Sequence, residues 1–288
     1  MLDVRKLRLL CDLERLGTIA AVAQARTYTP SAVSQQLSAL ERETGLPLLE
    51  RTGRRVTFTP AGRVLARHAA TVLAALEETG AALAALRAGP AGPLRIGAFP
   101  TAVRTLLPPA LVTLGRDHPA LELMVTELDP ADAPAALRER RLDVALLNDY
   151  DVAPGDVDPD LDSVPLLDET VFLAVPAGGD CDTLDGARDQ PWILASEGTL
   201  CHEATVRACA AHGFTPRVRH RADDFATVLA LVGAGQGVSL VPELAAGRAT
   251  GVRLVALSLR RRTRIAYRRG AAGHPSVAAL VAALTGVN

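Results

Sequence analysis

The fold of the N-terminal part of the chain is decided by the stretch TPSAVSQQLSALERETG, residues 29–45. Thr29 is a good N-cap, and Pro30 suits the first helical position, where its missing N–H group costs nothing. Gly45 is a residue typical of the C-terminal end of a helix. Together these signals predict a helix over residues 30–44.

This helix has two faces of different character. The apolar face can pack on a preceding helix and carries Val33, Leu37 and Leu40. The opposite face is small and polar, so it can lie deep in the major groove of DNA, where Gln35 can bond bidentately to an adenine. The alternative is a polar face that only meets solvent. The expected DNA contacts from this helix are Thr29, Pro30, Ser31, Ser34, Gln35 and Ser38.

The flanking sequence fits a small DNA-binding domain. We expect helices at residues 4–16 and 19–25, and a β-hairpin wing from strands at 46–50 and 55–59. Three arginines in the wing can hold phosphate or reach into the minor groove: Arg51, Arg54 and Arg55. Residues 1–60 hold nine Lys/Arg against six Asp/Glu, a net charge of +3, whereas the remainder holds 22 against 26. This asymmetry is a mild sign of an anionic partner, and chance is its alternative.

A long helix is expected from Pro60 to about Ala88. Its apolar positions recur at alternating spacings of four and three residues: Leu65, Ala69, Val72, Leu76, Thr79, Leu83 and Leu86. A sustained heptad pattern favours a coiled-coil partner, so we predict dimerisation through this helix. The alternative is an amphipathic helix that lies on its own domain.

The sequence after the GPAGP linker at residues 89–93 has another pattern. Short strands alternate with helices, among them a helix over 102–117, and this alternation predicts a parallel sheet with helices on its faces. Residues 151–163 look irregular, and two separate strands are expected at 252–257 and 264–268. We expect two α/β halves with a cleft between them.

Residues 18–62 resemble the DNA-binding domain of LysR-type transcriptional regulators. The resemblance rests on the runs AVSQQL (32–37), LE (40–41), GLPL (45–48), ER (50–51) and TPAG (59–62), in order and spacing. Members often carry arginine where this chain has Gln35, which leaves the base preference at that position open. After the linker, LRIG (94–97), LLP (106–108), LDVA (142–145) and GAGQGV (233–238) resemble the family's effector-binding domain.

The resemblance implies a domain plan. It comprises an all-α winged helix-turn-helix over residues 1–60, a linker helix over 61–88, and an α/β effector domain over 89–288. This last domain has the type II periplasmic-binding-protein fold, with two Rossmann-like subdomains at about 94–163 with 267–288, and about 164–266. The implied partners are double-stranded DNA, a small-molecule effector, RNA polymerase, and further copies of the chain in a dimer or tetramer.

The effector is expected between the two subdomains. Free N–H groups after the first strand, together with the Thr101 hydroxyl, form a natural anion site at Pro100, Thr101 and Ala102. This favours a carboxylate-bearing effector, although Thr101 as a plain N-cap is the alternative. The resemblance adds Pro130, Asn148, Ser196 and Phe225 as further contacts.

Other classes of protein fit poorly. The glycines at 233, 235 and 237 follow a predicted helix and open a strand, the reverse of a dinucleotide loop. We expect no catalytic activity, cofactor or metal, and we expect a cytoplasmic location because neither a signal peptide nor a membrane span is recognisable.

A redox sensor of the same family is the alternative function, because the family includes peroxide sensors with two cysteines in this region. Cys209 stands near one of those positions, but Cys201 is shifted by one. Eight residues along a helix span about 12 Å, too far for a disulfide.

Overall fold

The computed structural model describes residues 2–52, 55–86, 89–155, 158–247 and 250–286. The chain divides into two compact units, Met1–Ala88 with Arg268–His274, and Gly89–Tyr267 with Pro275–Asn288. No helix in the described ranges is long and apolar enough to cross a membrane.

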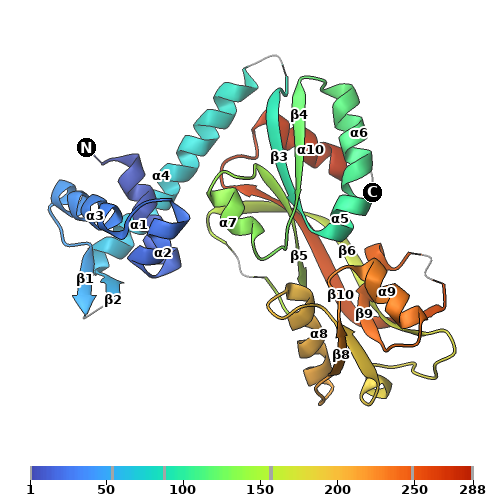
Figure 1. The fold of residues 1–288 in the computed structure, drawn as a ribbon. Helices are drawn as coiled ribbons and strands as arrows, with labels where there is room; N and C mark the ends of the chain where they lie inside the picture. The colour runs from blue at the N-terminus through green and yellow to red at the C-terminus, as the bar shows by residue number, and fades with distance from the viewer. Residues whose placement is uncertain (1, 53–54, 87–88, 156–157, 248–249, 287–288) are drawn as a thin grey trace. The chain divides into compact units, whose positions relative to one another are not determined.

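The first unit contains helices α1 (Val4–Leu16), α2 (Ile19–Ala25) and α3 (Pro30–Thr44), the hairpin β1 (Leu49–Thr52) and β2 (Arg55–Phe58), and helix α4 (Pro60–Ala85) (Figure 1). The predicted bounds of the first three helices are confirmed, because their ends carry strong local signals. Thr29 Oγ1 accepts from Ala32 N at 3.1 Å. Gly45 closes α3 with φ of 68°, a left-handed conformation that suits glycine.

The junction between the hairpin and α4 is tightly packed. Thr59 caps α4 by accepting from Gly62 N at 3.0 Å, and it donates to Pro47 O at 2.8 Å. A Cβ atom on Gly62 would lie 2.1 Å from Leu48 O, so only glycine allows this approach. The hairpin is therefore fixed to the start of α4.

The second unit is built on a six-stranded mixed sheet of order β4-β3-β5-β10-β6-β9. The strands are β3 (Gly92–Ala98), β4 (Leu121–Glu127), β5 (Val144–Tyr150), β6 (Leu161–Pro176), β9 (Ser239–Pro242) and β10 (Val252–Arg268). Strand β3 runs parallel to β4 and β5, whereas β10 is antiparallel to β5. A separate parallel pair is formed by β7 (Pro191–Leu194) and β8 (Arg217–Arg221).

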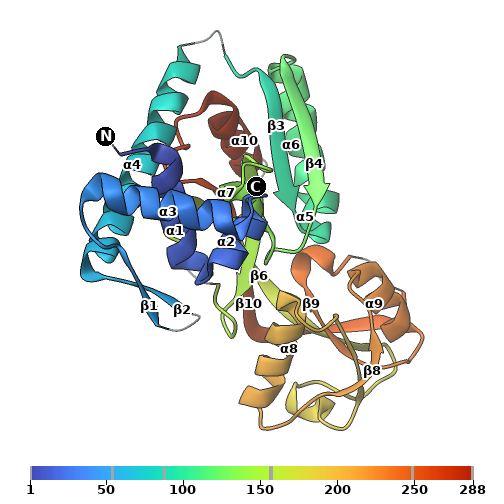
Figure 2. The same ribbon diagram turned by 60° about the vertical axis from the view of Figure 1, so that its left-hand side comes forward.

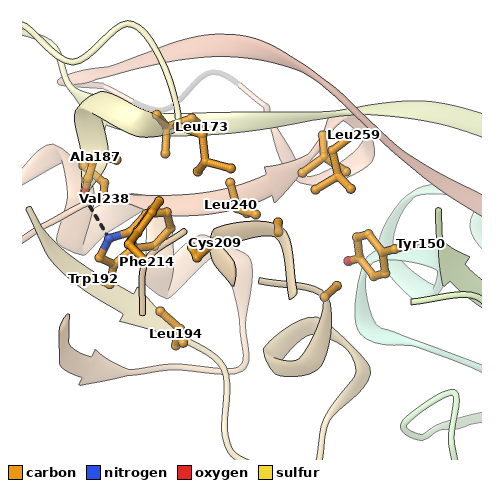
Figure 3. Packing of buried hydrophobic residues seen from close by; sticks show 14 of the residues in the cluster. Tyr150, Leu173, Ala187, Trp192, Leu194, Cys209, Phe214, Val238, Leu240 and Leu259 are labelled. Carbon is orange, nitrogen blue, oxygen red and sulfur yellow. Dashed lines mark hydrogen bonds between the residues drawn. The ribbon is translucent and has the colours of Figure 1, made fainter. Parts of the chain in front are cut away.

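Six α-helices and two short 3₁₀ helices accompany these strands in the described part of the unit. They are α5 (Pro100–Thr105), α6 (Leu107–Asp117), α7 (Ala133–Arg138), η1 (Asp185–Ala187), α8 (Leu200–Ala211), α9 (Phe225–Gly233), η2 (Glu243–Ala245) and α10 (Pro275–Thr285). Helices α6 and α10 lie against each other beside β3 and β4 (Figure 2). Trp192, Phe214 and Cys209 lie in a buried cluster, and Tyr150 lies at the end of it far from Trp192 (Figure 3).

Two expectations about this unit were wrong. The helix predicted over 102–117 is two helices, because the prolines at 108 and 109 lack the N–H groups needed to continue α5. The strands predicted at 252–257 and 264–268 are one strand, β10, and β6 extends back into the stretch expected to be irregular. The missed parts of these strands contain charged residues, which weaken the hydrophobic pattern by which a strand is recognised in sequence. In the structure these residues pair across the sheet, as Arg260 does with Asp168 at 2.9 Å.

Candidate functional site

Helix α3 presents a polar face to solvent. Its apolar residues Val33, Leu37 and Leu40 are at most 2% exposed in the core of the first unit. On the other side Ser31, Gln35 and Ser38 are exposed, and Ser34 is half-buried. A buried apolar side therefore holds the helix in place and leaves a small polar face free, which is the geometry that the sequence predicted. The DNA contacts themselves stay predictions.

A buried ion pair fixes α1 relative to the turn that precedes α3. Asp12 on α1 is 4% exposed, and both of its carboxylate oxygens accept from Arg26, at 2.6 Å from Nε and 3.0 Å from Nη2. This charge-assisted, two-bond contact ties α1 to the turn between α2 and α3.

Tyr28, which was not among the residues predicted from the sequence, lies in this turn and is 52% exposed beside the N-terminus of α3. An exposed aromatic residue there is a further candidate contact for DNA.

The wing is described only in part. In the hairpin Arg51 is opposite Val56 and Thr52 is opposite Arg55. Arg54 and the side chains of Arg51 and Arg55 lie outside the described residues, so their roles stay predictions.

The predicted heptad positions of α4 fall into two groups. Leu65 and Ala69 pack in the core of the first unit, as an amphipathic helix would. The later positions Val72, Leu76, Leu83 and Leu86 are 43–83% exposed. The later half of α4 thus carries an apolar surface that the first unit leaves largely exposed, which is typical of a surface that binds another copy.

The predicted effector residues differ in solvent exposure and in whether their polar atoms already have hydrogen-bond partners. Thr101, Ala102 and Asn148 are at most 5% exposed, while Pro100, Pro130, Ser196 and Phe225 are half-buried. Ser196 is held, since its Oγ donates to Asp223 at 2.8 Å. The alternative that Thr101 is an N-cap is wrong, because Pro100 takes the first helical position and Phe99 is the N-cap. An ion pair at 2.8 Å between Arg104 and Asp224 joins α5 to the start of α9.

A buried charged group that the sequence analysis missed lies close to these residues. Arg261 on β10 is 1% exposed, and its Nε donates to Glu169 Oε1 at 2.7 Å on β6. The guanidinium lies 5.0 Å from the centre of the Phe99 ring, just before α5. In the sequence Arg261 is the middle one of three consecutive arginines, which lie between the two strands predicted at 252–257 and 264–268. Only the register of the sheet shows that Arg261 points inward.

Tyr150 and Cys201 lie beside this arginine. The Tyr150 hydroxyl is 3.4 Å from Cys201 Sγ, and Tyr150 is directly opposite Arg261 in the sheet. Burial raises the pKa of Tyr150 well above its usual value, and the neighbouring thiol adds to that rise. Burial also raises the pKa of Cys201. Both groups are therefore neutral hydrogen-bonding partners near pH 7.

The cysteines do not form a reactive pair in this conformation. Cys201 and Cys209 both lie on α8 and both are free thiols. Burial raises the pKa of Cys209 to about 12, so it holds little of the reactive thiolate. No cluster of three or more potential metal ligands was found among the described residues.

Comparison with known proteins gives matches along almost the whole chain. Residues 4–63 match the bacterial regulatory helix-turn-helix protein, lysR family, and residues 87–288 match the LysR substrate binding domain. A probable hydrogen peroxide-inducible genes activator of Mycobacterium avium is 35% identical over 80% of this chain and 77% of its own length. The transcriptional dual regulator GltC of Bacillus subtilis is 27% identical over 84% of this chain and 81% of its own. A variant of OxyR from Corynebacterium glutamicum superposes with a TM-score of 0.60 at 26% identity, covering 99% of this chain and 91% of that one.

Proposed function

The chain belongs to the LysR family of transcriptional regulators, and we propose that it acts as a dimer or tetramer that binds dyad promoter sites and responds to a small molecule. The observation that carries this proposal is α3, whose exposed serine and glutamine face is held rigid by a fully buried opposite face. Access to promoter DNA requires the cytoplasm, where we place the protein.

In the proposed complex α3 lies in the major groove. Gln35 reads a base, with Ser31, Ser34 and Ser38 on the same face, and Thr29 and Pro30 lie at the helix end that favours phosphate. The wing arginines Arg51, Arg54 and Arg55 bind flanking phosphate. Two chains pair through the exposed apolar positions of α4 within the linker helix, residues 61–88. This pairing places two α3 helices on half-sites about 34 Å apart.

The C-terminal domain, residues 89–288, senses the effector. We propose contacts from Pro100, Thr101, Ala102, Pro130, Asn148, Ser196 and Phe225. Effector binding favours one arrangement of the two subdomains over another, and only a difference in affinity between the arrangements can shift that equilibrium. The altered arrangement changes how the oligomer holds DNA and engages RNA polymerase. Thr101→Val should weaken the response to effector, and a full response in that variant would exclude Thr101 as a contact.

A selection of binding sites from random duplex DNA with the purified full-length chain tests the proposal. We expect enrichment of a dyad sequence whose half-sites are about one helical turn apart. The absence of any enriched sequence, in a selection at low salt where the phosphate contacts that position the protein are strongest, would contradict it.

Redox sensing is a second candidate function, favoured by the similarity of the chain to several probable hydrogen peroxide-inducible genes activators. A disulfide between Cys201 and Cys209 would need α8 to unfold, since helical residues eight apart are separated by about 12 Å. A double Cys201→Ser, Cys209→Ser variant that loses its response to peroxide would support this function. An unchanged response would remove it.

A further inference from the structure

Four side chains on β5 and β10 share one face of the sheet. Tyr150 is directly opposite Arg261, and Asn148 is directly opposite Thr263. Alternate residues of a strand point to the same side, so the two pairs are neighbours on that side. All four are buried, with Arg261, Thr263 and Asn148 at 1%, 2% and 5% exposure.

Three polar atoms of this group have no hydrogen-bond partner among the described residues. They are Arg261 Nη2, Thr263 Oγ1 and Asn148 Oδ1. Buried polar atoms without partners are rare in folded proteins, and each one calls for an explanation. Three such atoms on adjacent positions of two strands indicate that a group from outside the chain completes them.

Two contacts fix the arginine, and neither of them involves its Nη2 atom. Its Nε is bound to Glu169 and its guanidinium plane lies over Phe99, so the direction of Nη2 is set. Glu169 balances its charge. Arg261 Nη2 can only donate, Asn148 Oδ1 can only accept, and the Thr263 hydroxyl can do both. A ligand that satisfies the group must therefore both accept and donate hydrogen bonds.

From this arrangement we infer that the effector is a short carboxylic acid with a hydroxyl or ammonium donor next to its carboxylate. The carboxylate accepts from Arg261 and Thr263, and the donor bonds to Asn148. Directly opposite residues in an antiparallel pair have Cβ atoms about 5 Å apart, which suits a donor one or two bonds from the acid group. The inference rests on the proposed effector role of this domain and names the chemistry that it would recognise.

Titration calorimetry of the full-length chain with acetate, glycolate and glycine, and with propionate, lactate and alanine, tests the inference. The hydroxy or the amino acid of each set should bind at least about tenfold more tightly than the plain acid, since the plain acid leaves Asn148 Oδ1 buried and unpaired. Comparison of glycolate with glycine, and of lactate with alanine, shows whether the site prefers a hydroxyl or an ammonium donor.

Two near-isosteric variants test which side chains cause the preference for an acid with a hydrogen-bond donor. Asn148→Leu should abolish the preference for a donor, and Thr263→Val should weaken binding of the preferred acid about tenfold. Neither should lower the melting temperature of the ligand-free protein, since each removes an unpaired buried atom. Thr126→Val on the exposed face of β4 is the matched control and should change nothing.

Failure of the inference can be told apart from failure of the proposed function. If none of these acids binds, or if Asn148→Leu keeps the preference for a donor, the inference is overturned. Selection of a dyad DNA site by the same preparation would show in either case that the regulator function stands.

Discussion

Glu169→Gln tests the buried ion pair that organises the second unit. Glu169 and Arg261 are 2% and 1% exposed, and the carboxylate also accepts from Leu244 N at 2.6 Å. Glutamine keeps the shape and one acceptor but removes the charge, and its amide N–H groups face a donor, either Arg261 Nε or Leu244 N. Breaking a buried pair by removing one partner costs about 3–5 kcal/mol because the other charge is left uncompensated. We expect a loss of that size in the free energy of unfolding.

The measurement is urea unfolding followed by the fluorescence of Trp192, the single tryptophan of the chain, which is fully buried in the same unit. Asp168→Asn is the control, since Asp168 pairs with Arg260 at the surface and such pairs contribute about 0–1 kcal/mol. The double change Glu169→Leu, Arg261→Met should recover much of the stability. A loss below about 1 kcal/mol in Glu169→Gln would show instead that the pair behaves like a hydrated surface pair.

Three further predictions concern other parts of the chain. Gly62→Ala places Cβ 2.1 Å from Leu48 O, and the forced shift should cost about 1–3 kcal/mol, seen as a lower melting temperature of the first unit by circular dichroism; an unchanged melting curve would show that the hairpin yields freely. Leu76→Glu adds a charge to the exposed apolar surface of α4 and should shift the mass measured by light scattering toward the monomer, whereas Thr71→Glu, which is also exposed but off this surface, should not. Cys209 has its pKa raised to about 12, so about one thiol in ten thousand is ionised at pH 8 and alkylation by iodoacetamide should be negligible until the chain unfolds. The folded state holds the Cys209 thiol proton more tightly than the unfolded state does. The stabilisation from the protonated thiol should therefore be complete below about pH 8.5 and should fall as pH rises toward 12. Rapid labelling of Cys209 in the folded protein at pH 8 would contradict the raised pKa and the pH dependence that follows from it.

The DNA-binding unit could be predicted from the sequence because its signals are local. Thr29, Pro30 and Gly45 set the ends of α3 within the helix itself, and the spacing of Val33, Leu37 and Leu40 sets its buried face. Each of these features depends only on residues a few positions away.

The effector domain was harder to predict because its decisive contacts are distant in sequence. Arg261 and Glu169 are 92 residues apart, and neither residue type indicates burial by itself. The orphaned atoms of Asn148 and Thr263 follow from the register of two strands separated by more than a hundred residues. Asn148 was predicted through the family resemblance, but its partners required the structure.

Base recognition by α3 underlies the proposed function, and Gln35→Ala removes the side chain expected to contact a base. The variant is compared with the wild type and with Gln190→Ala, an exposed glutamine in the second unit, on duplexes that vary one base pair at a time. A glutamine–adenine contact contributes about 1–3 kcal/mol of discrimination, so Gln35→Ala should lose that preference at one position in each half-site and keep it elsewhere. If Gln35→Ala and Gln190→Ala both retained the full wild-type specificity, Gln35 would not contact a base and the proposed role of α3 in base recognition would be wrong.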